Sequence, residues 1–131
     1  MPHSVPPPRH VFVYGTLRAG GSNDIARYAP SPARVGDGEI TGTLYDLGDY
    51  PGALLAGPGK LRGEVYRITP AVEAALDALE GIEEDGSGEY LKREVDVWVD
   101  GTWLACLVYE IHLERVRDAP VIASGDWFSR G

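Results

Sequence analysis

The sequence predicts a single α+β domain built on a small curved β-sheet or barrel. At least five segments have the pattern of β-strands, whereas only one has the pattern of an α-helix. The chain has 131 residues with 17 glycines and 10 prolines, a content that favours short strands and tight turns over a helical bundle. A chain of this length builds one core, so we expect one domain over residues 10–131, preceded by a flexible Pro-rich tail over residues 1–9.

The first expected strand ends in the most informative turn of the chain. The apolar run Val11–Tyr14 predicts a buried strand, which Gly15 interrupts sharply. The elements expected from there to residue 68 are one helical turn over 24–28, a weakly alternating strand from Gly38 to Gly48, turns over 50–52 and 57–59, and a strand over 62–68. Short strands separated by such turns are typical of a small curved sheet.

One helix is predicted over 70–79. Thr69 is a favourable N-cap residue, and Pro70 at the first helical position loses no hydrogen bond. Gly81 is placed to end the helix. Apolar residues at helical spacing give it one apolar face: Val72, Ala75, Leu76 and Leu79.

A β-hairpin is predicted over residues 91–111. Apolar and polar residues alternate from Leu91 to Val99, and an apolar run follows from Trp103 to Ile111. Between them, Asp100-Gly101 is a residue pair that two-residue hairpin turns favour. The hairpin adds two antiparallel strands to the expected sheet.

Charge and composition argue against several classes of partner. A net charge of −8 disfavours nucleic acid and anionic membrane surfaces, since both attract basic proteins. The first residues lack the apolar core of a signal peptide, so a cytoplasmic location is expected. The single Cys106 fits a reducing compartment and cannot form an intrachain disulfide. The three histidines lack ligand spacing, so no metal site is predicted.

The segment Tyr14-Gly15-Thr16-Leu17 is a candidate anion-binding turn. A strand that ends in a glycine turn can present consecutive backbone N–H groups, and such groups bind a carboxylate or a phosphate. An ordinary turn at the end of a strand has the same pattern, so the residues alone leave both interpretations open.

Glu80 stands where helices rarely place an acid. The negative end of the helix dipole disfavours a carboxylate in the last turn by about half a kcal/mol. Glu80 also follows Leu76 by one turn and so borders the apolar face. Partial burial and the dipole would both raise its pKa, which suits acid–base catalysis near neutral pH. The alternative is an exposed carboxylate that happens to end the helix, and spacing alone favours that plainer interpretation.

Other reactive side chains are expected to be structural. Tyr109 is expected in the core rather than at a cavity, and Cys106 is expected to be a small core residue, since no histidine is placed to activate it. Four carboxylates after the helix are interpreted as a solvated acidic loop: Glu83, Glu84, Asp85 and Glu89.

Five segments and Tyr90 carry a resemblance that covers the chain from His10 to Phe128. The segments are Val-Phe-Val-Tyr-Gly-Thr-Leu-Arg (11–18), Gly-Thr-Leu-Tyr-Asp-Leu-Gly-Asp-Tyr-Pro-Gly (42–52), Gly-Glu-Val-Tyr-Arg-Ile (63–68), Leu-Asp-Ala-Leu-Glu-Gly (76–81) and Ser-Gly-Asp-Trp (124–127). In this order and at these spacings, they resemble the γ-glutamylcyclotransferase-like family, which includes the γ-glutamylamine cyclotransferases and the plant avirulence-induced proteins.

This resemblance implies a small mixed β-barrel flanked by short helices, with a cavity at one mouth. In active members the α-amino group of a γ-glutamyl compound attacks its own γ-carbonyl, which closes 5-oxoproline and expels an amine or amino acid. Tyr14, Gly15, Thr16 and Leu17 match the substrate-binding loop, and Glu80 matches the catalytic acid–base glutamate. The implied substrate is a small γ-glutamyl amine, amino acid or peptide, and the chemistry needs no metal or cofactor.

The chain departs from the family pattern near the expected cavity. Many members have Tyr-x-Arg after the catalytic glutamate, whereas this chain has Tyr90-Leu91-Lys92 followed by Arg93. The loop between Glu80 and Tyr90 is also long and acidic. Both features leave the identity of the γ-glutamyl compound open.

Two other functions remain alternatives. A non-catalytic binder of small carboxylate-bearing metabolites would keep the 14–17 turn and would not need Glu80. A protein-interaction module would display exposed aromatic residues such as Trp98 or Trp127, but the chain lacks long amphipathic or low-complexity segments. The presence of Glu80 favours the enzyme.

Overall fold

The computed structural model describes residues 9–83 and 85–129. A five-stranded sheet has the strand order β2-β5-β1-β7-β6, and a second sheet pairs β3 with β4. The described elements are, in chain order, β1 (Arg9–Val13), the 3₁₀ helix η1 (Ile25–Arg27), β2 (Ala33–Thr41), β3 (Thr43–Asp46), β4 (Pro51–Leu54), β5 (Lys60–Ile68), the α-helix α1 (Pro70–Leu79), β6 (Tyr90–Val99), β7 (Thr102–Ile111), and the 3₁₀ helices η2 (Leu113–Val116) and η3 (Trp127–Ser129).

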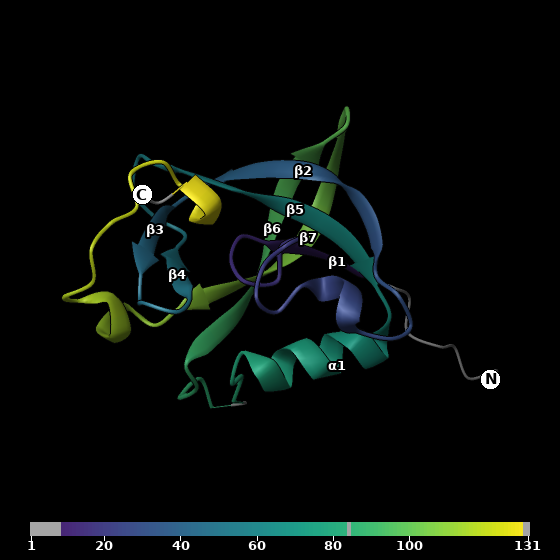
Figure 1. Cartoon of the computed structure of the whole chain (residues 1–131), viewed down its shortest axis with the longest axis horizontal. Helices are drawn as coiled ribbons and strands as arrows, with labels where there is room; N and C mark the ends of the chain where they lie inside the picture. The colour runs from purple at the N-terminus through teal and green to yellow at the C-terminus, as the bar shows by residue number, and fades with distance from the viewer. Residues whose placement is uncertain (1–8, 84, 130–131) are drawn as a thin grey trace.

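The main sheet is mixed and strongly curved. β1 pairs in parallel with β7 and antiparallel with β5, and the other neighbouring strands pair antiparallel. The edge strands β2 and β6 contact each other, so the sheet curls into a half-barrel. Figure 1 shows β2 and β5 arching across the molecule, with α1 along the opposite side. The expected small, mixed and curved sheet is therefore confirmed.

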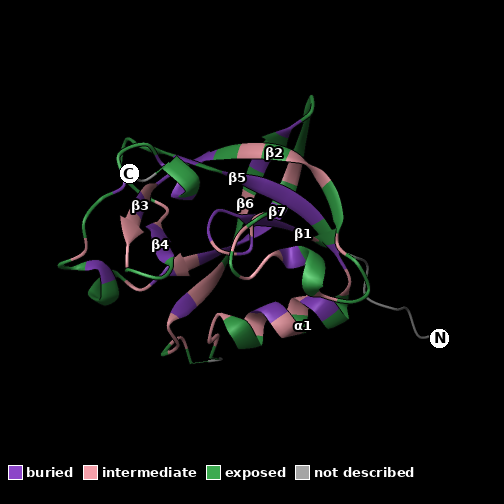
Figure 2. Cartoon of the chain, viewed as in Figure 1, coloured by how far each residue is buried: buried purple, intermediate pink, exposed green. Residues whose placement is uncertain are grey.

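The central strand β1 is buried on both faces. Val11 and Val13 pack in the same cluster as Val72 and Leu76 of α1. Phe12 points the other way, into a second cluster. Strands that are covered on both faces have continuous apolar runs, which explains why β1 shows no alternation. Figure 2 shows the buried residues concentrated in the central strands and on one face of α1.

The helix α1 begins and ends as the sequence predicts. Thr69 Oγ1 accepts a hydrogen bond from the Val72 N–H at 3.2 Å, and Pro70 lies in the first turn. Gly81 follows the C-cap residue Glu80 with a φ of 67°, the left-handed conformation that commonly ends helices. The helix end therefore holds Glu80 at a fixed position.

The hairpin of β6 and β7 is confirmed together with its turn. The two strands pair in one continuous antiparallel register along their whole length. Asp100 and Gly101 have φ values of 52° and 83°, as a type I′ turn requires. The turn residues therefore set the register of the longest strand pair in the described structure.

The strand expected from Gly38 to Gly48 is wrong as a single element. It is the end of β2 followed by β3, because the chain leaves the main sheet at Gly42. A Cβ atom at Gly42 would lie 2.7 Å from Leu61 and 2.8 Å from the carbonyl oxygen of Leu54. Only glycine fits this close approach, so the position that looked like part of a strand is a junction.

The small sheet of β3 and β4 was not expected. The turn predicted over 50–52 is instead the beginning of β4 at Pro51. β2 also begins at Ala33, five residues before the expected strand. Both differences arise where a strand is short or polar and is specified by its pairing rather than by its own periodicity.

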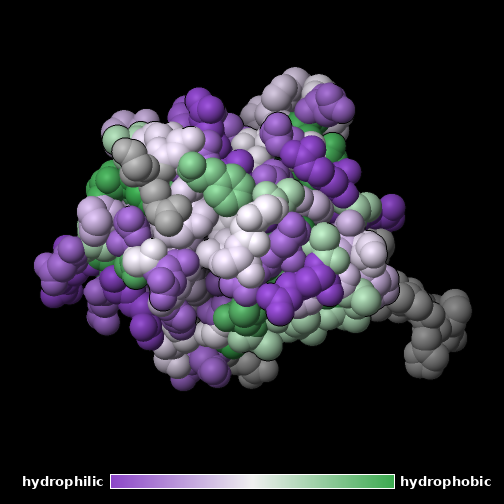
Figure 3. Space-filling view, in the orientation of Figure 1, coloured by the Kyte–Doolittle hydropathy of each residue, from purple (hydrophilic) through white to green (hydrophobic). Residues whose placement is uncertain are grey.

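Of the tail expected over residues 1–9, residues 1–8 lie outside the described residues, and Arg9 begins β1. Within the described ranges, no helix has the length and apolar character needed to cross a membrane. Figure 3 shows hydrophilic and neutral residues over most of one face, with hydrophobic residues in small separate patches.

Candidate active site

A cavity of about 260 Å³ contains all five residues that the sequence assigns to the site. Tyr14, Gly15, Thr16 and Leu17 follow the end of β1, and Glu80 follows the end of α1. The cavity is completed by residues from β1, the following loop, the β3–β4 turn, β4, the end of α1, and β6 and β7: Phe12, Val13, Ser22, Asn23, Asp49, Tyr50, Pro51, Leu79, Glu89, Tyr90 and Tyr109.

The 14–17 segment forms a closed turn that leaves backbone donors available. The Arg18 N–H donates to the Gly15 carbonyl oxygen at 3.1 Å, and the Asn23 N–H donates to the Thr16 carbonyl oxygen at 2.9 Å. In contrast, the N–H groups of Thr16 and Leu17 donate no hydrogen bond to any described residue. Two adjacent free N–H groups at a cavity wall can bind a carboxylate of a ligand.

Gly15 is required by packing rather than by an unusual backbone conformation. Its φ is not positive. A Cβ atom at this position would lie 2.6 Å from Cγ and 2.9 Å from Cδ of Pro51. The glycine therefore allows the turn to lie directly against β4, which forms another part of the cavity wall.

Two buried tyrosine hydroxyls hold this wall together. Tyr14 Oη donates to the Tyr109 carbonyl oxygen at 2.6 Å and accepts the Ala53 N–H at 3.2 Å. Tyr90 Oη donates to the Pro51 carbonyl oxygen at 2.8 Å. Burial raises the pKa of Tyr14 and Tyr90, and the negative charge of Glu80 raises both further, so both hydroxyls stay protonated. Tyr14 thus contributes its ring to the cavity, while its hydroxyl is used within the protein.

Glu80 has the surroundings of an acid–base group. Its carboxylate lines the cavity and makes no hydrogen bond or ion pair with a described residue. Burial is the main cause that raises its pKa to about 7, and the nearby charge of Glu89 contributes the rest. At neutral pH the group is therefore populated in both protonation states, and it can accept or donate a proton.

Glu89 is a cavity residue that sequence reasoning placed in the solvated acidic loop, and for this residue that expectation is wrong. It lies immediately before β6, lines the cavity, and accepts a hydrogen bond from Tyr50 Oη. Glu83 and Asp85 are exposed as expected, whereas Glu84 lies outside the described residues. The sequence did offer one signal for Glu89: it directly precedes the strand that begins near Tyr90. A residue at the start of a strand is held more firmly than one in the middle of a loop.

Tyr109 has both of the roles considered for it. Its ring packs in the core, it also lines the cavity, and its hydroxyl donates to Asp77 Oδ1 at 2.7 Å. Lys92 Nζ lies 2.8 Å from Asp77 Oδ2 and 2.7 Å from Glu73 Oε2. Lys92, which stands where many family members have arginine, therefore pairs with α1 and does not line the cavity.

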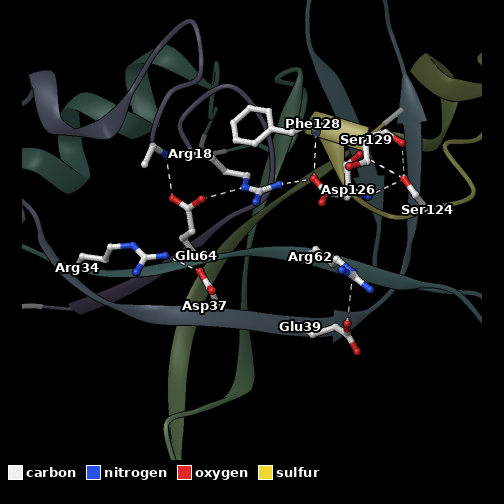
Figure 4. Close-up of polar contacts among 11 residues, drawn as sticks. Arg18, Arg34, Asp37, Glu39, Arg62, Glu64, Ser124, Asp126, Phe128 and Ser129 are labelled. Carbon is white, nitrogen blue, oxygen red and sulfur yellow. Dashed lines mark hydrogen bonds and ion pairs between the residues drawn. The ribbon is translucent and has the colours of Figure 1, made fainter. Parts of the chain in front are cut away.

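Arg18, the cation that follows the turn, points away from the cavity. Its Nε lies 3.0 Å from Glu64 Oε2, its Nη1 lies 2.6 Å from Asp126 Oδ1, and its guanidinium stacks 4.4 Å from the ring centre of Phe128. Figure 4 shows the guanidinium between the two carboxylates. We call these four residues, Arg18, Glu64, Asp126 and Phe128, the arginine clamp.

Exposed aromatic residues give limited support to an interaction module. Trp98 is 52% exposed and packs edge-on against Trp103. Trp127 is buried, so the expectation that it is displayed on the surface is wrong. Leu79 is also exposed, at 45%, rather than part of the buried helix face, because it lies at the cavity.

The charge of the cavity is uniformly acidic among its described residues. Asp49, Glu80 and Glu89 line it, and none of the lining residues is Lys, Arg or His. No group of three or more His, Cys, Asp or Glu side chains in the described ranges is arranged to hold a metal ion.

A curled half-barrel has a cavity that joins the candidate anion-binding turn to a carboxyl group with a pKa near neutrality, and this arrangement is suited to proton transfer on a small molecule. The family model described as "Gamma-glutamyl cyclotransferase, AIG2-like" matches residues 11–129. The chain belongs to this family.

Relatives in the family resemble the chain over nearly its whole length. The γ-glutamylcyclotransferase family protein YtfP of Escherichia coli K12 is 36% identical over 121 residues, which cover 92% of this chain and 96% of YtfP. A Vibrio cholerae protein described as a putative gamma-glutamylcyclotransferase is 38% identical over 122 residues, with the same shares covered. The solution structure of E. coli YtfP superposes with a TM-score of 0.64, covering 92% of this chain and 97% of that one.

The crystal structure of an AIG2-like protein from Mus musculus is similar as well. It is 26% identical and has a TM-score of 0.69, covering 87% of this chain and 85% of the mouse chain. The fold implied by the sequence resemblance is therefore the fold of this family.

Proposed function

We propose that the protein is a γ-glutamyl cyclotransferase, which converts a small γ-glutamyl amine, amino acid or peptide into 5-oxoproline and releases the amine. One observation carries the proposal: Glu80, with a pKa of about 7, shares a cavity with the free N–H groups of Thr16 and Leu17. The cytoplasmic location and the absence of a cofactor, both expected from the sequence, belong to the same proposal.

The turn and the glutamate divide the work. The N–H groups of Thr16 and Leu17 bind the α-carboxylate of the γ-glutamyl group. Glu80 takes a proton from the α-ammonium group, whose freed lone pair attacks the γ-carbonyl carbon of the same molecule. Because both reacting groups belong to one bound molecule, the main task of the cavity is to hold it folded with these groups close together.

The proton balance suits a single carboxyl group. The new bond joins the α-nitrogen to the γ-carbon, and the bond from the γ-carbon to the departing nitrogen breaks. The α-ammonium group loses two protons in becoming the lactam N–H, and the departing amine gains two and leaves as an ammonium ion. Glu80 carries the two protons one after the other, accepting each from the α-nitrogen and returning it to the departing nitrogen, so it ends the cycle ionised.

The test is a panel of γ-glutamyl compounds scored for release of 5-oxoproline. On any compound that is turned over, Glu80→Gln should lower the rate by about a hundred- to ten-thousand-fold, because the amide cannot exchange a proton. Glu83→Gln is the matched control, since it removes an exposed carboxylate three residues away. A Glu80→Gln enzyme that keeps more than about a tenth of the rate would exclude this role.

The same panel separates the enzyme from a non-catalytic binder. The free N–H groups at the cavity would also hold a carboxylate-bearing metabolite without any reaction. Calorimetric binding of 5-oxoproline or of γ-glutamyl compounds, together with no turnover of the whole panel, would favour the binder.

A further inference from the structure

The arginine clamp joins three segments that are far apart in the sequence. Arg18 follows the 14–17 turn, Glu64 lies in β5, and Asp126 and Phe128 belong to the C-terminal segment. Glu64 is a buried charged residue, only 4% exposed. Burying a carboxylate costs free energy unless its oxygens accept hydrogen bonds or pair with a cation. The donors that Glu64 binds therefore show which segments it holds in place.

Glu64 holds the residues immediately after the turn. Its Oε2 accepts the Arg18 Nε–H at 3.0 Å, and its Oε1 accepts the Ala19 backbone N–H at 2.8 Å. The Tyr66 hydroxyl donates to the same Oε1 at 2.8 Å. One carboxylate thus binds both a side chain and the main chain of two consecutive residues, which fixes the direction of the chain there.

The held residues determine the position of the turn itself. The Arg18 N–H closes the turn on the Gly15 carbonyl oxygen, and the Ile25 N–H binds the Leu17 carbonyl oxygen at 2.9 Å. The segment that bears the free N–H groups is therefore fastened on both sides.

The C-terminal segment completes the clamp from the other side. Asp126 Oδ1 receives both Arg18 Nη1 and the Phe128 N–H, the latter at 3.0 Å. Gly125 adopts a φ of 68°, and its carbonyl oxygen accepts the Arg62 N–H of β5 at 2.8 Å. Figure 4 shows the resulting arrangement, with Arg18 enclosed between Glu64 and Asp126.

We propose that Glu64 is a positioning residue for the 14–17 turn: through Arg18 and the Ala19 N–H it holds the free N–H groups of Thr16 and Leu17 where a ligand carboxylate binds. The catalytic consequence rests on the proposed cyclotransferase function, whereas the effect on the turn does not. Glu64 itself lies outside the cavity lining, so it acts through the turn and not on the ligand.

The test uses Glu64→Gln and a chemically matched control. Glutamine keeps one acceptor oxygen but places an NH₂ donor against either the Arg18 Nε–H or the Ala19 N–H, so one of the two holding contacts is lost. In the control, Glu110→Gln, the native carboxylate likewise accepts a guanidinium Nε, from Arg93 at 3.0 Å, and a backbone N–H, from Leu55 at 2.8 Å. Arg18→Lys is a second variant that keeps the charge but loses the planar fork.

We expect KM for a confirmed γ-glutamyl substrate, and Kd for 5-oxoproline measured by calorimetry, to rise about tenfold in Glu64→Gln and Arg18→Lys and not in Glu110→Gln. The pH at which the rate rises should stay unchanged, since Glu80 is untouched. Loss of folded enzyme alone would instead lower kcat at constant KM. A KM and a Kd equal to those of Glu110→Gln would overturn the proposal.

Hydrogen exchange makes the result independent of activity. The amides of Arg18, Asn23 and Ile25 depend on the turn for their hydrogen bonds, so in Glu64→Gln they should exchange about tenfold faster than in Glu110→Gln. If the wild type neither turns over nor binds any compound, faster exchange in Glu64→Gln would still support the positioning role of Glu64, while the proposed cyclotransferase function would be rejected. Unchanged exchange removes the positioning role in either case.

Discussion

Replacing Glu80 by glutamine should stabilise the folded protein, by an amount that depends on pH. The carboxyl group has an ordinary pKa of 4.5, which burial and the charge of Glu89 raise to about 7 in the fold. The folded state therefore binds this proton more tightly than the unfolded chain does. Stability from Glu80 is fully present below about pH 4.5 and is lost as the pH rises through about 7.

The size of the effect follows from the same two values. Each pH unit between them corresponds to about 1.4 kcal/mol, so ionised Glu80 costs the fold up to about 3 kcal/mol. Glutamine resembles the protonated form and carries no such cost above pH 7. For a domain of this size, 3 kcal/mol corresponds to roughly 10 °C in Tm.

The assay is thermal unfolding of wild type and Glu80→Gln at about pH 4.5, 6 and 8 in one salt concentration. The Tm of the variant should gain on that of the wild type steadily across this series, because all other titrating groups are shared. Glu83→Gln, which removes an exposed carboxylate outside the cavity, is the control variant in the same series. A constant Tm difference for Glu80→Gln would refute the raised pKa and, with it, the physical basis for assigning acid–base chemistry to this residue.

Three further predictions concern catalysis, packing and substrate choice. On a confirmed substrate, kcat/KM should rise with pH through about 7, where Glu80 ionises. Glu89→Gln should move this rise to lower pH, because it removes the charge that helps to raise the pKa of Glu80. A wild-type profile that is flat with pH would contradict the role of Glu80. Gly15→Val should weaken 5-oxoproline binding in calorimetry and cost about 1–3 kcal/mol of stability through collision with Pro51, and Pro51→Ala should recover part of the stability if that collision is the cause. The charged residues that line the cavity are all acidic, namely Asp49, Glu80 and Glu89, so they should favour a substrate whose departing amine carries a positive charge. We expect kcat/KM to be highest for γ-glutamyl-diaminobutane, lower for γ-glutamyl-butylamine and lowest for γ-glutamyl-aminobutyrate, with about a tenfold difference between the extremes. An inverted order would show that the acidic lining does not select the leaving group.

The parts of the fold that could be read from the sequence are those with local signals. Thr69 and Gly81 mark the ends of α1 within the helix itself, and Asp100-Gly101 marks the β6–β7 turn. β2 and β4 have no comparable signal. β2 is stabilised by pairing with β5, some thirty residues later in the chain, and Pro51 reads as a breaker although it begins β4 at the edge of a two-stranded sheet.

The same distinction applies to the site. Glu80 drew attention because an acid at a helix end conflicts with the helix dipole, a conflict visible within a few residues. Spacing alone still favoured an exposed carboxylate, and the family resemblance supplied its expected role. Glu89 and Tyr50 were not, because their contact joins positions 39 residues apart and exists only once the β3–β4 turn has folded back toward β6. Glu64 likewise looked like an ordinary strand residue, since its partners come from a loop and from the C-terminal segment.

One wall of the cavity is formed by the small β3–β4 sheet, which is separate from the main sheet. The β3–β4 sheet is fastened by hydrogen bonds between β4 and the hydroxyls of Tyr14 and Tyr90, and its turn brings Asp49 and Tyr50 to the cavity. Asp49 and Tyr50 in that turn are exposed, whereas Gly48 has a φ of 102° that favours glycine. The turn can therefore change in length or charge while the half-barrel and Glu80 stay as they are. Changes to a few residues of this turn would therefore alter which small molecule the cavity accepts without rebuilding the rest of the fold, both during evolution and in design.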